Sequence, residues 1–122
     1  MPLHEKARVL VVDDIADSAI AMGLLLESDG YEVRVARDGM QALEATSEFK
    51  PHCILLDIGM PRMDGLELAN IIRERFGDEI VLIAITGRPM DGQHVRETFR
   101  RVDHYFRKPV DHEQLRKVLP PP

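Results

Sequence analysis

Three aspartates follow two apolar runs of this 122-residue sequence and carry the side chains that metal-assisted phosphoryl transfer needs. Asp57 comes directly after residues 53–56, and Asp13 and Asp14 come directly after residues 9–12. Carboxylate oxygens are the ligands that hard cations such as Mg²⁺ prefer. A carboxylate can also be the nucleophile that accepts a phosphoryl group, forming an aspartyl phosphate. We therefore expect Mg²⁺, with Mn²⁺ as an alternative, at these three acids.

A hydroxyl and an ammonium group follow two further apolar runs. Residues 80–85 lead to Thr86 and Gly87, and residues 102–107 lead to Lys108. Phosphoryl transfer has a loose transition state, so a protein contributes mainly by positioning groups and balancing charge. Lys108 could neutralise the transferred group, while the Thr86 hydroxyl and the Gly87 amide could donate hydrogen bonds to it.

Each of these residues also has a simpler interpretation. Asp13 or Asp14 could cap the helix that follows, as aspartate often does. Lys108 could be a surface charge, and Thr86 could bond locally at the end of a strand. Helix capping does not require such groups at the ends of several apolar runs, and the coincidence favours phosphoryl transfer.

The elements that must position these groups alternate along the chain. Apolar or alternating runs predict strands at 9–12, 32–36, 53–57, 80–85 and 102–107. Helical spacing of apolar residues predicts helices at about 17–29, 38–48, 64–76, 93–101 and 111–119. Strands alternating with helices indicate a five-stranded, doubly wound α/β sheet with parallel strands. In such sheets ligands bind at the carboxyl ends of the strands, where these side chains would meet.

Composition indicates one globular domain over residues 1–122, with a core at about 8–119 and a proline stub or linker at 120–122. Hydrophobic residues make up 44% and charged residues 30%, which is not the composition of a disordered chain. The formal charge of -5 argues against a surface that binds nucleic acid directly.

The expected compartment is the cytoplasm. Cys53 is the single cysteine, which excludes an intrachain disulfide and suits a reducing environment. No apolar run reaches the roughly 18 residues that a membrane-spanning helix needs, so we expect no membrane insertion.

Four motifs, taken in order and spacing, resemble the receiver domain of two-component response regulators. The motifs are Val11-Val12-Asp13-Asp14, residues 55–65 around Asp57, Ala84-Ile85-Thr86-Gly87 and Lys108-Pro109. The resemblance covers residues 8–119 and implies a flavodoxin-like sheet with strand order 2-1-3-4-5, flanked by five helices.

The resemblance implies a role for each acid. The residue matching Asp57 accepts a phosphoryl group from a sensor histidine kinase or phosphotransfer domain. The residues matching Asp13 and Asp14 hold Mg²⁺ together with Asp57, and the backbone carbonyl of Gly59 completes the metal site. Such a domain promotes only its own phosphorylation and dephosphorylation and is not a true enzyme.

The resemblance also implies a switch. Residues matching Thr86 and Lys108 contact the phosphoryl group, and the peptide between Lys108 and Pro109 is typically cis. The Thr86 hydroxyl moves toward the phosphoryl group, and Tyr105 rotates inward to fill the space. The fourth helix, fifth strand and fifth helix then dock a downstream protein or output domain. Tyr105 could instead be a half-buried strand aromatic with its hydroxyl in water.

Several residues depart from the usual receiver pattern. Ile15 stands where many relatives carry a polar residue, and Arg101 stands where a glycine commonly ends the fourth helix. A positive φ at Arg101 would cost roughly 1 kcal/mol or more. Arg88 and Gly59 flank the acceptor at positions associated with water access.

Two other functions fit the same pattern. One is a receiver-like interaction module that works without phosphorylation, which the complete acidic set disfavours. The other is a small phosphohydrolase with an aspartyl-phosphate intermediate, which the short chain disfavours because it leaves little room for a cap over a substrate.

Overall fold

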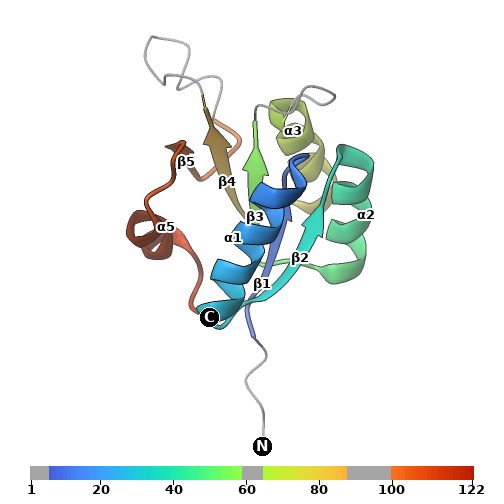
Figure 1. Ribbon diagram of the computed structural model, residues 1–122. Helices are drawn as coiled ribbons and strands as arrows, with labels where there is room; N and C mark the ends of the chain where they lie inside the picture. The colour runs from blue at the N-terminus through green and yellow to red at the C-terminus, as the bar shows by residue number, and fades with distance from the viewer. Residues whose placement is uncertain (1–5, 59–64, 88–99) are drawn as a thin grey trace, which may run out of the picture.

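The computed structural model describes residues 6–58, 65–87 and 100–122 (Figure 1). Its sheet has five parallel strands in the order β2-β1-β3-β4-β5, which confirms the predicted topology. The strands are β1 (Arg8–Val12), β2 (Glu32–Ala36), β3 (Cys53–Asp57), β4 (Val81–Thr86) and β5 (His104–Arg107).

Four helices lie within the described residues, whereas we expected five in the whole chain. They are α1 (Ala16–Ser28), α2 (Gly39–Phe49), α3 (Gly65–Phe76) and α5 (His112–Val118). The remaining expected helix, at 93–101, falls almost entirely outside the described residues, which exclude 88–99.

β5 and α5 are shorter than expected. β5 begins at His104 because Asp103 turns its carboxylate toward β4, where it accepts a hydrogen bond of 2.9 Å from the Leu82 amide. α5 ends at Val118 because Leu119 is extended (φ -72°, ψ 147°), as a residue that precedes a proline prefers.

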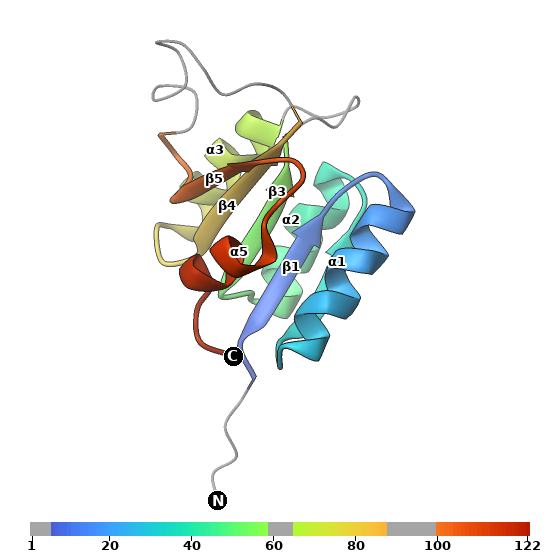
Figure 2. The same cartoon turned by 60° about the vertical axis from the view of Figure 1, so that its left-hand side comes forward.

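The helices cover both faces of the sheet. α1 and α5 lie on one face, and α2 and α3 lie on the other (Figures 1 and 2). Side chains alternate between the faces of a strand. Val9, Val11 and Leu55 therefore belong to the core under α1 and α5. Leu10 and Leu56 belong to the core under α2 and α3.

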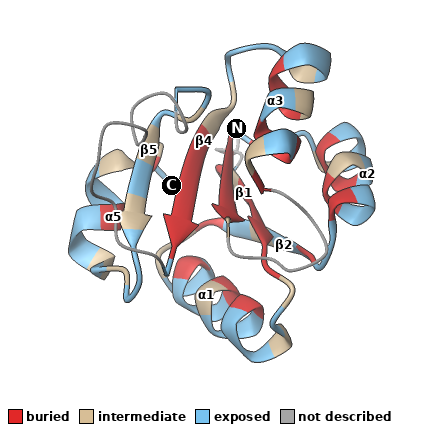
Figure 3. Cartoon of the chain, turned by 90° about the horizontal axis from the view of Figure 1, so that it is seen from above, coloured by how far each residue is buried: buried red, intermediate tan, exposed pale blue. Residues whose placement is uncertain are grey.

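The central strands are the most deeply buried part of the sheet. All five residues of β3 are buried, whereas β5 at the edge alternates between intermediate and exposed. Figure 3 shows the same contrast between β1 or β4 and the edge strands β2 and β5. Cys53 is fully buried, and this burial raises the pKa of its thiol to about 12.

The C-terminal segment is attached to the turn between α1 and β2. The Asp29 carboxylate lies 2.7 Å from both His112 Nε2 and Arg116 Nη2 of α5. The Tyr31 hydroxyl donates a hydrogen bond to the Pro120 carbonyl.

None of the described helices combines the length and the apolar character that crossing a membrane requires.

Candidate functional site

The ends of β1 and β3 bring the three predicted aspartates together. Val12 of β1 pairs with Leu56 of β3, and the residues that follow them are Asp13 and Asp57. One carboxylate oxygen of each of Asp13, Asp14 and Asp57 lies within 4.8 Å of those of the others. Asp13 and Asp57 are buried and Asp14 is partly exposed. The predicted cluster therefore exists, at the carboxyl edge of the sheet.

Asp13 is held by the loop that contains it. Its amide donates to the Ala36 carbonyl at 3.1 Å, and its Oδ1 accepts from the Ile15 amide at 3.0 Å. Ile15 is the N-cap of α1 and makes no side-chain capping bond. The idea that Asp13 or Asp14 is the N-cap residue is therefore wrong.

Burial raises the pKa of Asp13 above its ordinary value because it disfavours the charged carboxylate. The hydrogen bond from the Ile15 amide opposes this rise, and the negative charge of Asp57 adds to it. The cluster therefore concentrates negative charge that a bound cation would offset.

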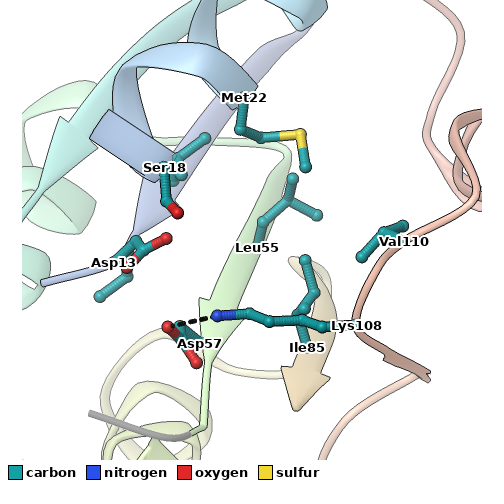
Figure 4. A pocket seen from close by; sticks show the side chains of 10 residues that line it. Asp13, Ser18, Met22, Leu55, Asp57, Ile85, Lys108 and Val110 are labelled. Atoms are coloured by element: carbon teal, nitrogen blue, oxygen red, sulfur yellow. Dashed lines mark hydrogen bonds and ion pairs between the residues drawn. The ribbon is translucent and has the colours of Figure 1, made fainter. Parts of the chain in front are cut away.

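Lys108 supplies a positive charge at the same place. Its Nζ lies 3.0 Å from Asp57 Oδ2 (Figure 4). The backbone around it is tied to β4, because the Lys108 amide donates to the Thr86 carbonyl at 2.7 Å. The peptide between Lys108 and Pro109 is cis, as the sequence motif led us to expect.

Thr86 is the last residue of β4, one residue beyond the strand partner of Asp57. Asp57 pairs with Ile85 in the sheet register, and Thr86 is buried. Tyr105 pairs with Ala84 on the edge strand and is 40% exposed. This exposure agrees with a half-buried strand aromatic, and an inward rotation of Tyr105 stays a prediction.

Of the four other positions singled out from the sequence, the structure describes two. Gly87 directly follows β4, and a Cβ added there would meet no atom within 4 Å. Gly59 and Arg88 lie outside the described residues. Arg101 is not among the described residues with positive φ, so the strain considered for it does not arise.

A pocket of about 180 Å³ opens beside the aspartates. Met22 of α1, Leu55, Ile85 and Val110 form its apolar part. The polar part consists of Asp13, Ser18, Asp57 and Lys108, whose side chains are drawn together in Figure 4. The acidic cluster therefore borders a recess and is not a flat surface.

Two residues that the sequence did not assign to the site contact it. Arg37 Nη2 donates to the Asp14 carbonyl at 2.7 Å across a separation of 23 residues, a contact without a local pattern. A Cβ on Gly65 would lie 3.0 Å from Ile58 Cα and 3.1 Å from the Asp57 carbonyl oxygen. Gly65 therefore permits α3 to begin close to the backbone of Asp57. The Asp-Gly pair in the loop motif was the available signal for it.

The donor set fits a divalent cation. Three carboxylates provide hard oxygen ligands of the kind that Mg²⁺ and Mn²⁺ prefer. The raised pKa of Asp13 is the expected behaviour of a buried acid cluster, and a cation would relieve the repulsion that contributes to it.

Known proteins resemble this chain over most of its length. A family model described as the response regulator receiver domain matches residues 9–120. Response regulator MprA of Mycobacterium ulcerans (strain Agy99) is 37% identical over 110 residues, covering 88% of this chain and 46% of that protein. The MprA protein of Mycobacterium leprae (strain TN) is 36% identical and is covered to 47%. The chain thus spans less than half the length of these curated relatives.

Solved structures agree with this match. The response regulator TrrA of Thermotoga maritima, in complex with Mg²⁺-BeF, superposes with a TM-score of 0.78 at 30% identity, covering 91% of this chain and 94% of that one. A CheY-like receiver domain protein of Methanospirillum hungatei JF-1 gives 0.83 at 26% identity, with 93% and 90% covered. This chain belongs to the response regulator receiver domain family of two-component signalling.

Proposed function

We propose that this chain is a phosphoacceptor signalling domain in which Asp57 takes a phosphoryl group from a phosphohistidine. The donor would be a sensor histidine kinase or a phosphotransfer domain. The observation that carries the proposal is the placement of the buried Asp57 carboxylate 3.0 Å from Lys108 Nζ, with Asp13 and Asp14 beside it.

In the transfer step, a carboxylate oxygen of Asp57 forms a bond to phosphorus while the bond from phosphorus to the donor's imidazole nitrogen breaks. The nitrogen takes the electron pair of the broken bond. Lys108 would balance charge on the transferred group, and the Thr86 hydroxyl and Gly87 amide would donate hydrogen bonds to its oxygens.

Asp13, Asp14 and Asp57 would hold Mg²⁺ or Mn²⁺, with the Gly59 carbonyl as a further ligand. When bound, the cation would offset the negative charge of the phosphoryl group and of the acids. The Thermotoga maritima relative in complex with Mg²⁺-BeF supports this requirement.

Phosphorylation would add a charge of roughly -1.5 to -2 at the sheet edge and bias a two-state element formed by Thr86 and Tyr105. Docking of a downstream protein or output domain would follow, on the face formed by residues 93–101, β5 and α5. We include in the proposal a single domain over residues 1–122 that works in the cytoplasm, a compartment that the free thiol of Cys53 suits.

A turnover assay separates this function from that of a phosphohydrolase. The chain is incubated with excess p-nitrophenyl phosphate and, separately, with excess phosphoramidate, each with Mg²⁺. We expect no sustained hydrolysis of the ester, and phosphate release from phosphoramidate only as fast as the labelled chain loses its own phosphoryl group. Sustained, Asp57-dependent hydrolysis of the ester would support the phosphohydrolase instead.

A further inference from the structure

The guanidinium group of Arg37 reaches the acidic loop from the turn between β2 and α2. Its Nη2 donates to the Asp14 carbonyl oxygen at 2.7 Å. The Arg37 amide donates to Gln41 Oε1 at 2.8 Å, and the Gln41 amide donates to Asp38 Oδ1 at 2.8 Å. The turn that carries Arg37 is therefore fixed to the first turn of α2.

A second bond ties the same two segments together. The Asp13 amide donates to the Ala36 carbonyl at 3.1 Å, directly before Arg37. The ends of β1 and β2 are thus joined at two successive residues on each side. Asp14 is partly exposed, whereas Asp13 is buried and held by the Ile15 amide. Packing therefore restrains Asp14 less than Asp13. For this reason a hydrogen bond that holds the Asp14 backbone contributes more to its position than the same bond would at Asp13.

We propose that Arg37 is a positioning residue for the divalent-cation site. By holding the Asp14 carbonyl, Arg37 fixes the backbone from which the Asp14 carboxylate reaches the cation. This inference rests on the proposed function, because it requires the cation that phosphorylation needs.

The charge and the hydrogen bond of Arg37 act in opposite directions on cation binding. A positive charge near the acids repels a cation, whereas a ligand held in place binds it more tightly. Arg37 is exposed, and dissolved salt screens its charge. The hydrogen bond should therefore outweigh the repulsion, and the sign of the change on substitution distinguishes the two effects.

The test is a Mg²⁺ titration of the full chain by isothermal titration calorimetry. Arg37→Met removes both the charge and the hydrogen-bond donor but keeps a long, unbranched side chain. Arg37→Lys keeps the charge and a donor. We expect Arg37→Met to weaken Mg²⁺ affinity by about 10-fold, the lower end of the effect of outer-shell partners. Arg37→Lys should recover part of this loss.

Arg34→Met is the matched control. It removes an exposed arginine charge from β2, three residues before Arg37. The Arg34 guanidinium lies 5.9 Å from the centre of the Phe49 ring. We expect Mg²⁺ affinity within about 2-fold of the wild type, because exposed charges are screened. A second readout is the amide NMR signal of Ile15 without Mg²⁺, which should shift in Arg37→Met and stay in place in Arg34→Met.

Unchanged or tighter Mg²⁺ binding by a folded Arg37→Met variant would overturn the positioning role. The same holds if Arg37→Met and Arg34→Met weaken binding equally. Failure of the proposed function has a different signature. Wild-type protein that binds no Mg²⁺, or an Asp13→Asn variant with unchanged affinity, would overturn the cation site itself and the role of Arg37 with it.

Discussion

At the scale of single residues, the ion pair between Asp57 and Lys108 joins a buried carboxylate to a more accessible ammonium group. The exposed fractions of the two side chains are 7% and 37%. Asp13 contributes a second buried acid close to Asp57. Lys108 therefore offsets part of the negative charge at the site.

Lys108→Met should slow phosphorylation by phosphoramidate without preventing Mg²⁺ binding. Loss of one positioned group that stabilises developing charge typically costs about 100-fold or more in rate. Mg²⁺ affinity should be unchanged or higher, because a positive charge beside the acids is removed. Initial rates and calorimetric titration measure the two effects separately.

Lys117→Met is the matched control for this variant, since Lys117 is an exposed residue of α5. It should phosphorylate at the wild-type rate. Wild-type rates in Lys108→Met would show that this lysine has no part in transfer.

The sequence identified residues whose chemistry stands at the ends of apolar strands. Asp13, Asp14, Asp57 and Lys108 all follow such a run, and the structure brings their charged groups together. Arg37 could not be found in this way, because it follows no long apolar run and its bond to the Asp14 carbonyl spans 23 residues without a local pattern.

At the scale of the elements, a buried arginine on α3 joins two chain segments at the edge of the sheet opposite the site. The side chain of Arg73 is 5% exposed. It donates to the carbonyls of Ile80 and Arg101 at 2.7 and 2.9 Å and to Asp103 Oδ2 at 2.8 Å. The start of β4 and the segment before β5 are therefore held by one side chain.

Arg73→Met should lower the free energy of unfolding by about 3 kcal/mol, because it leaves the carbonyls of Ile80 and Arg101 without their hydrogen-bond donor. Urea denaturation monitored by circular dichroism gives the value. Arg75→Met, an exposed change on the same helix, should cost less than about 0.5 kcal/mol. Equal losses in the two variants would contradict the role of Arg73.

The contact between α5 and the end of α1 should make the stability of the fold depend on pH. The hydrogen bond from Arg116, with a smaller contribution from His112, lowers the pKa of Asp29 below its ordinary value of 3.8. The folded pKa lies below the unfolded one, so this stabilisation is present above about pH 4 and disappears as the pH falls through the folded pKa.

Asp29→Asn should therefore reduce stability at pH 6 and converge with the wild type at low pH. Melting temperatures across this range measure the difference. Asp17→Asn, at an exposed position of α1, is the control and should run parallel to the wild type. A constant gap between Asp29→Asn and wild type at all pH values would contradict the assignment.

The helix and strand boundaries show where sequence patterns are sufficient. β2 and β3 occupy the predicted residues, because alternating or continuous apolar runs define them. β5 was predicted two residues too long, because the hydrogen bond that turns Asp103 toward Leu82 is a tertiary contact.

At the scale of the whole molecule, the sheet separates two apolar cores and presents the site at one edge. The parallel arrangement follows from the alternation of strands and helices. This layout places the acids on a rigid platform, since β1 and β3 are central strands with neighbours on both sides.

The fold was predictable because the alternation of strand and helix patterns runs along the whole chain. The partner that such a domain docks is not predictable in this way. The curated relatives extend well beyond the matched part, because this chain covers less than half the length of each. Surfaces that select a kinase or an output domain depend on exposed side chains, which no periodic pattern encodes.

The most direct test of the central claim is intact-protein mass spectrometry after incubation with phosphoramidate, with and without Mg²⁺. We compare the wild type with Asp57→Asn and with Asp38→Asn, a conservative change at the exposed N-cap of α2. We predict one phosphoryl group per chain, formed only with Mg²⁺, in the wild type and Asp38→Asn, and none in Asp57→Asn. The same adduct on Asp57→Asn, or no adduct on a wild-type chain that binds Mg²⁺, would contradict the account.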